Sequence, residues 1–171
     1  VVAGSLGAQF LLWEYATVIA SALIGINPFD QPDVESAKIA ARGMLEGRAE
    51  EVREDFSENG IEVRALGFDL GSATSVKVAI DALLATVADD GYRSIHAYLD
   101  RTSYGSAQEL RELVSKRTGR PTTFGWAPRF LHSTGQYHKG GPKQGVFLQL
   151  TSDFASDLEI EGRPFTFGTL I

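Results

Sequence analysis

The chain has 171 residues, of which 43% are hydrophobic and 22% are charged, and it carries a net charge of -6 with a sequence pI near 5.1. This composition is that of an ordinary soluble globular domain, long enough to bury a core. The acidic balance argues against nucleic acid as the main partner, because binding to a phosphate backbone needs clustered lysine and arginine. The lack of cysteine excludes disulfides, a thiol nucleophile and thiolate metal sites, and it is compatible with a reducing cytoplasm.

The first long segment, Phe10 to Ile26, is apolar on every face apart from Glu14, Thr17 and Ser21. Such a pattern predicts a buried helix. A membrane span is the alternative interpretation, but the run is shorter than the ~20 apolar residues that a bilayer needs, and it carries Glu14 near one end. We therefore expect this helix to lie in a protein core rather than in a membrane.

Beyond this segment, helical and extended patterns alternate along the chain. Helices are predicted from Val34 to about Glu58, from Ser75 to Ala88 and from Ser106 to Lys116. Strands are predicted at Ile61 to Phe68, Ser94 to Leu99, Pro121 to Trp126 and Gly145 to Thr151, with a turn at Asn59-Gly60. This alternation indicates an α/β layered domain with a mostly parallel or mixed sheet flanked by helices. His96, in the second of these strands, is expected to be an ordinary buried or half-buried residue.

A first polar stretch, residues 27–38, has the sequence NPFDQPDVESAK. It holds more prolines, acids and amides than a plain connector needs. If Pro32 or Asp33 opens a helix, Lys38 lies one turn into that helix and Gln31 lies in the loop before it. Glu35 shares a helix turn with Lys38, so it is expected to pair with Lys38 or to cap the helix. A simple helix-entry loop with a solvated lysine is the structural alternative.

A second polar stretch, residues 128–143, has the sequence PRFLHSTGQYHKGGPK. It is too cationic for a core segment, its glycines permit close backbone approach, and its cations suit an anion. A helix N-terminus or a nest of amides here would attract a phosphate. A zinc site at His132 and His138 is disfavoured, because no third histidine is near and the lysines repel a cation. A purely structural glycine-rich loop is the other alternative.

Both stretches resemble one enzyme family. Phe29-Asp30-Gln31, Val34-Glu35 and Lys38, at their spacing, resemble the C-terminal signature of phosphoglucose isomerases. Residues 132–136, His-Ser-Thr-Gly-Gln, resemble the His-Ser-x-Gly-Gln motif of the bacterial enzymes, although here that motif follows the lysine signature instead of preceding it. The longer strings around both motifs are similar to the isomerase portion of bifunctional transaldolase/phosphoglucose isomerase chains. The resemblance is thinnest from about Gly43 to Ser94.

The resemblance implies a sugar isomerase-like (SIS) domain that interconverts glucose 6-phosphate and fructose 6-phosphate through a cis-enediol. Lys38 and His132 would take part in opening the sugar ring. The substrate would be bound by Gln31, Gln136, Arg129 and Lys139. No metal or organic cofactor is required, and the expected setting is the cytoplasm.

The catalytic carboxylate is missing from this scheme, because the Glu-Ser-x-Gly-Lys type motif that carries it in the isomerases is not in the sequence. The chain also lacks an initiator methionine and stops on an apolar run. We therefore expect residues 1–171 to form a single C-terminal isomerase domain, truncated at both ends and nearly inactive alone. Its partners would be an upstream isomerase subdomain and, in the fusion chains, a transaldolase domain. A non-catalytic sugar-phosphate-binding domain is the alternative function.

Overall fold

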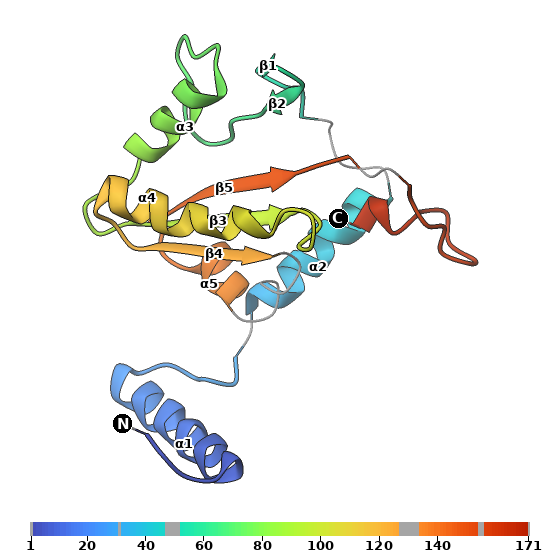
Figure 1. Cartoon of the computed structure of the whole chain (residues 1–171). Helices are drawn as coiled ribbons and strands as arrows, with labels where there is room; N and C mark the ends of the chain where they lie inside the picture. Colours follow the sequence, from blue (N-terminus) through green and yellow to red (C-terminus); the bar gives the residue numbers. More distant parts are fainter. Residues whose placement is uncertain (1, 31, 47–51, 127–133, 154–155, 171) are drawn as a thin grey trace.

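The computed structural model describes residues 2–30, 32–46, 52–126, 134–153 and 156–170. Figure 1 shows the elements in chain order. They are α1 (Leu6–Ile24), α2 (Pro32–Leu45), β1 (Phe56–Glu58), β2 (Ile61–Val63), α3 (Val76–Ala85), β3 (Tyr92–Tyr98), the 3-10 helix η1 (Gly105–Glu109), α4 (Leu110–Thr118), β4 (Thr122–Trp126), α5 (Thr134–Gly140), β5 (Gly145–Thr151) and the 3-10 helix η2 (Gly168–Leu170).

A parallel sheet with strand order β4-β3-β5 forms the centre of the molecule. Ile95 of β3 lies opposite Phe124 of β4 on one side and Leu148 of β5 on the other. Parallel strands need crossover connections: here α4 connects β3 to β4, and α5 returns the chain past β3 from β4 to β5. Right-handed crossovers that run in opposite directions along a sheet place their helices on opposite faces of it. The predicted α/β fold with a mostly parallel sheet is thus confirmed.

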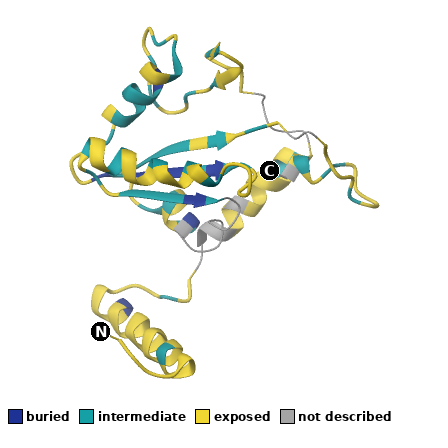
Figure 2. Cartoon of the chain, in the orientation of Figure 1, coloured by how far each residue is buried: buried dark blue, intermediate teal, exposed yellow. Residues whose placement is uncertain are grey.

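The hydrophobic core lies on one face of β3. Ile95 and Ala97 are 2% and 1% exposed, and Figure 2 shows burial concentrated along this strand. Ile80 of α3 and Val114 of α4 line the same small pocket as Ile95, so α3 and α4 cover this face. On the opposite face, α5 packs on the sheet and α2 lies beside α5. The arrangement is therefore a three-layer α/β/α sandwich.

The segment that follows α2 differs from its prediction. The helix predicted from Val34 to Glu58 ends at Leu45, and Phe56–Glu58 form strand β1 instead. Gly43 lies in the last turn of the helix, and glycine lowers helix stability by roughly 1 kcal/mol relative to alanine. The predicted turn at Asn59-Gly60 is confirmed, because both residues have positive φ, 51° and 81°, as a two-residue β-hairpin requires.

Helix α1 confirms the predicted helix, but its predicted burial is wrong. Ser21 is its one buried residue, and Leu23 is 83% exposed. Figures 1 and 2 show α1 set apart from the sheet and exposed along its length. An all-round apolar sequence favours burial, but burial needs a partner surface, and the described part of the chain presents none to α1. Among the described helices, α1 alone is long and apolar enough to cross a membrane, a test of length and composition that core helices of soluble proteins also pass.

Candidate functional site

The fold brings together the two helices that carry the predicted site residues. α2 holds Lys38, and α5 holds Gln136 and Lys139. The two helices lie side by side, with α5 packed on one face of the sheet, although α2 precedes the sheet in the chain and α5 follows β4. The two polar stretches of the sequence thus meet in space through α2 and α5.

Lys38 lies on the exposed side of α2 and interacts with Glu35. Its Nζ atom is 3.5 Å from Oε2 of Glu35, and the Lys38 side chain is 54% exposed. The other carboxylate oxygen, Oε1, is 3.8 Å from Nη1 of Arg42. The predicted pairing of Glu35 with Lys38 is confirmed. Because Glu35 faces two cations, it is poorly suited to act as a free carboxylate base.

Three of the predicted site residues, Gln31, Arg129 and His132, lie outside the described residues. Arg129 and His132 belong to the connection that leaves the carboxyl end of β4 after Trp126 and leads to α5. In open parallel sheets, ligands bind outside the carboxyl ends of the strands, where the strand order reverses. In the order β4-β3-β5 that reversal occurs at β3, so the connection starts at the edge where this rule expects a ligand.

The remaining two predicted residues sit at different places on α5. Gln136 is half-buried within the helix, whereas Lys139 is exposed in its last turn. Residues 141–144 then lead directly into β5, so the end of α5 that carries Lys139 lies toward the amino ends of the strands. Of these two side chains, Gln136 is closer to the carboxyl edge of the sheet.

The sequence interpretation missed a hydrogen-bonded cluster between α5 and the sheet. Oη of Tyr92 is 2.7 Å from Nδ1 of His138. Oγ of Ser94 is 3.4 Å from Nε2 of His138 and 2.9 Å from Nε2 of His96. Thr123 of β4 donates its hydroxyl to Oγ of Ser94 at 2.8 Å. We call these five side chains the α5 anchor, because they connect α5 to β3 and β4.

One direction of donation satisfies every contact in the α5 anchor with both histidines neutral. Tyr92 donates to Nδ1 of His138, Nε2–H of His138 donates to Ser94, and Ser94 donates to Nε2 of His96. Burial lowers the pKa of His96, and the neighbouring His138 ring lowers it further. Burial also lowers the pKa of His138 and raises the pKa of Tyr92. These shifts favour the neutral forms that this assignment of donors uses.

The α5 anchor is suited to holding a helix, not to reacting with a solute. Ser94 is 1% exposed, so its hydroxyl is not accessible to a substrate. The rings of His96 and His138 lie 5.3 Å apart, and each packs against Phe147 of β5. The sequence held one signal for this cluster: Tyr92, Ser94 and His96 recur at every second position, which places three polar side chains on one face of a strand. The half-burial expected for His96 is confirmed.

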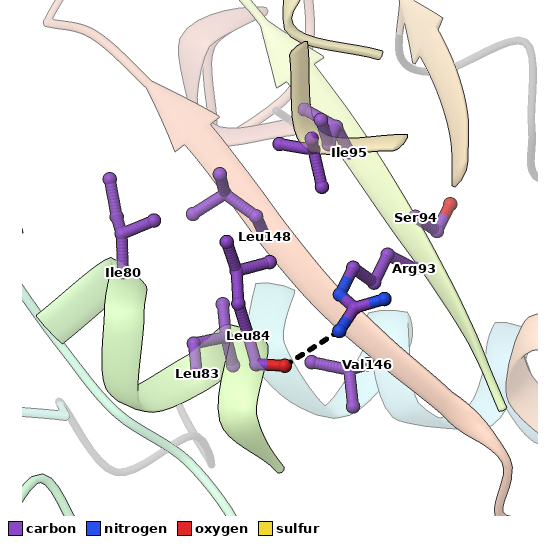
Figure 3. Close-up of a pocket in the computed structure, with 9 residues that line it drawn as sticks. Ile80, Leu83, Leu84, Arg93, Ser94, Ile95, Val146 and Leu148 are labelled. Atoms are coloured by element: carbon purple, nitrogen blue, oxygen red, sulfur yellow. Dashed lines mark hydrogen bonds between the residues drawn. The ribbon is translucent and has the colours of Figure 1, made fainter. Parts of the chain in front are cut away.

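The opposite face of the sheet holds two cavities, both lined mainly by apolar side chains. The larger, about 590 Å³, lies between β5, α3 and the segment that follows β2. The smaller, about 20 Å³, lies beside Arg93, which Figure 3 shows donating to the backbone oxygen of Leu84. Nε and Nη1 of Arg93 are buried and have no hydrogen-bond partner among the described residues. Neither cavity is lined by a described residue of α2 or α5, so the predicted site coincides with neither of them.

Comparison with known proteins supports part of the resemblance. No protein-family model matches the chain, and no solved structure matches it significantly. Two proteins named glucose-6-phosphate isomerase, from Synechococcus elongatus and another Synechococcus strain, are each 34% identical to it over 75 residues. That segment is 44% of this chain but 14% of each relative, so the chain spans a small part of the relatives it matches. Over part of its length, the chain is therefore similar to glucose-6-phosphate isomerases.

Proposed function

We propose that this chain is the lysine-bearing part of an aldose-ketose isomerase that interconverts glucose 6-phosphate and fructose 6-phosphate. The observation that carries the proposal is the 34% identity to two glucose-6-phosphate isomerases. The packing of α2 beside α5 supports it, because this packing brings the helix of Lys38 next to the helix that follows the His132 motif. The transaldolase fusion and the cytoplasmic setting stay predictions.

In this proposal the chain opens the sugar ring. Ring opening needs a group that gives a proton to the ring oxygen and a group that takes one from the hydroxyl at C1. Lys38 and His132 fill these two roles. The ammonium of Lys38 is held by Glu35 at 3.5 Å and remains open to solvent on its other side, as a group that meets a substrate must.

The phosphate of the substrate requires cations and amide donors. Arg129, Gln31, Gln136 and Lys139 supply them in the proposal. Arg129 belongs to the β4–α5 connection, and Gln136 is the better placed of the two candidates on α5. Lys139 lies at the far end of that helix, so we expect its removal to weaken sugar-phosphate binding less than removal of Gln136.

The proton transfer between C1 and C2 needs a carboxylate base that this sequence does not provide. Glu35 is engaged by Lys38 and Arg42. In the proposal the base therefore comes from a separate part of the complete enzyme, which agrees with the small share of the relatives that the chain spans. The same gap favours the second candidate function, a sugar-phosphate-binding domain without turnover.

The test is a coupled assay of glucose 6-phosphate conversion on the complete natural polypeptide, with Lys38→Ala and Lys77→Ala compared. Lys77 is an exposed lysine on α3 that pairs with Asp81, so its variant controls for loss of one surface charge. We expect Lys38→Ala to lower kcat by about a hundredfold or more, the scale of losing a general acid or base, and Lys77→Ala to leave kcat unchanged.

Two results would contradict the isomerase proposal. Equal turnover by the wild type and Lys38→Ala would remove Lys38 from the chemistry. A wild type that binds fructose 6-phosphate in calorimetry but shows no turnover would establish the binding domain instead.

A further inference from the structure

His138 joins α5 to the sheet through both of its ring nitrogens. Nδ1 lies 2.7 Å from the Tyr92 hydroxyl and Nε2 lies 3.4 Å from the Ser94 hydroxyl. The ring also stacks on Tyr92, with centroids 5.5 Å apart and planes at 30°. One side chain of α5 thus makes directional contacts with two residues of β3, which fix both the position and the rotation of the helix.

α5 is too short to hold its conformation by itself. It has seven residues, and isolated helices shorter than about 12 residues are marginal in water. Lys139 is exposed, and the exposed Tyr137 adds only a ring contact to Tyr92, with centroids 5.9 Å apart, so His138 supplies the hydrogen-bonded inward contact of the last turn. The conformation of α5 therefore depends on its attachment to the sheet.

Close packing at the start of β5 supports the position of Tyr92. A Cβ atom added at Gly145 would lie 2.7 Å from the Tyr92 hydroxyl oxygen, which is shorter than any contact a real Cβ makes. Glycine at this position leaves room for the tyrosine ring beside the start of β5, from where its hydroxyl reaches His138. The tyrosine hydroxyl is therefore fixed from two sides, by β5 and by α5.

We propose that His138, held by Tyr92 and Ser94, is a positioning residue that sets the place of Gln136 in the sugar-phosphate site. The placement of Gln136 at the sugar phosphate rests on the proposed function, since Gln136 is a proposed phosphate contact. The attachment of α5 to the two hydroxyls of β3 stands on the geometry alone. Gln136 precedes His138 by two residues in the same short helix, so a rotation of α5 moves both side chains together.

The experiment uses the complete polypeptide and three test variants: Tyr92→Phe, His138→Phe and the double variant that carries both changes. Tyr137→Phe is measured beside them. Tyr92→Phe deletes the hydroxyl on Nδ1, and His138→Phe keeps an aromatic ring but deletes both hydrogen bonds. Tyr137→Phe is the matched control, because it removes a tyrosine hydroxyl from the adjacent position of α5, where the side chain is 49% exposed. Two quantities are measured: amide hydrogen exchange over residues 134–140, and the Kd for fructose 6-phosphate.

We expect Tyr92→Phe and His138→Phe each to speed amide exchange in α5 by about tenfold, with exchange in α3 unchanged and no effect of Tyr137→Phe. The double variant should exchange little faster than His138→Phe alone, because both changes break the same contact. The Kd for fructose 6-phosphate should rise by about fivefold to tenfold in the first two variants.

Each contrary result has its own meaning. Unchanged exchange in α5 would overturn the attachment, whatever the protein binds. Faster exchange with an unchanged Kd would overturn the positioning role and leave the proposed function standing. A wild type that does not bind fructose 6-phosphate, with faster exchange in the variants, would reject the proposed function and keep the attachment of α5.

Discussion

The two faces of strand β3 place neighbouring polar residues in opposite surroundings. Ser94 points toward α5, where Thr123, His96 and His138 surround its hydroxyl. Arg93 points toward α3 and α4, where its Nη2 donates to the Leu84 carbonyl at 2.7 Å, while Nε and Nη1 find no partner in the part of the chain that the structure describes. Both residues are almost fully buried, at 1% and 6% exposure. Burial of a polar group is therefore stabilising or costly according to its partners, which differ between the two faces.

The largest expected effect lies on the face of β3 that packs against α5, where the buried polar groups have hydrogen-bond partners. Ser94→Ala removes the oxygen that receives the Thr123 hydroxyl and contacts both histidine rings, and it leaves those groups in a buried site. We expect a loss of about 1–3 kcal/mol in the free energy of unfolding, measured by urea denaturation. Ser57→Ala is the control, because Ser57 is an exposed strand serine in β1. A loss no larger than that of Ser57→Ala would show that the α5 anchor contributes nothing to stability.

Substitution of Arg93, on the other face of β3, should not lower the free energy of unfolding as substitution of Ser94 does. Arg93→Met keeps an unbranched chain of similar length among Ile80, Val114 and Val146, and it removes a buried charge with two unpaired donors. The lost hydrogen bond to Leu84 offsets part of the gain. We expect the free energy of unfolding to stay unchanged or to rise by about 1 kcal/mol. A loss as large as that of Ser94→Ala would mean that both faces depend equally on their polar groups.

The sequence predicted those elements whose local signals agree with the fold. Gly145 to Thr151 forms strand β5 as expected, and Ser75 caps α3 by accepting the Val78 amide at 3.3 Å. The Asn59-Gly60 turn has the backbone that this residue pair favours. In each case a few neighbouring residues contain the whole physical cause of the structure.

Features that depend on distant partners were beyond local pattern reading. Burial of α1 could not be inferred from its apolar composition, because a helix is buried only where another surface covers it. The spacing of Tyr92, Ser94 and His96 indicates a polar strand face, but not its partner: His138 is 46 positions from Tyr92 and meets it only through the crossover connection that returns the chain from β4 to β5. The ion pair of Lys38 with Glu35, three residues apart on one helix, was within reach of the sequence.

The smallest expected effect is a pH dependence that arises from the two histidines of the α5 anchor. Burial holds the pKa of His96 and of His138 below the usual 6.5. Between 6.5 and these lowered values the unfolded chain binds more protons than the folded chain, so stability must fall as the pH drops through this range. The carboxyls of Asp81, Asp100, Glu112 and Asp157 also have lowered pKa values, but the stability they provide is lost only below about pH 4.5.

Between about pH 7.5 and 5.5, protonation of the histidines therefore changes stability while the carboxyls stay ionised. We expect the urea midpoint to be lower at pH 5.5 than at pH 7.5, and this difference to shrink in a variant with both His96→Gln and His138→Gln. The effect should be smaller than that of Ser94→Ala, because both rings are half-exposed and solvent offsets part of the cost of charging them. Arg93→Met should keep the full pH difference, because the arginine guanidinium that it removes does not change its charge in this pH range. A midpoint that rises on acidification would show that the rings are better stabilised as cations, which would reverse the donor directions assigned at Nδ1 of His138 and at Nε2 of His96.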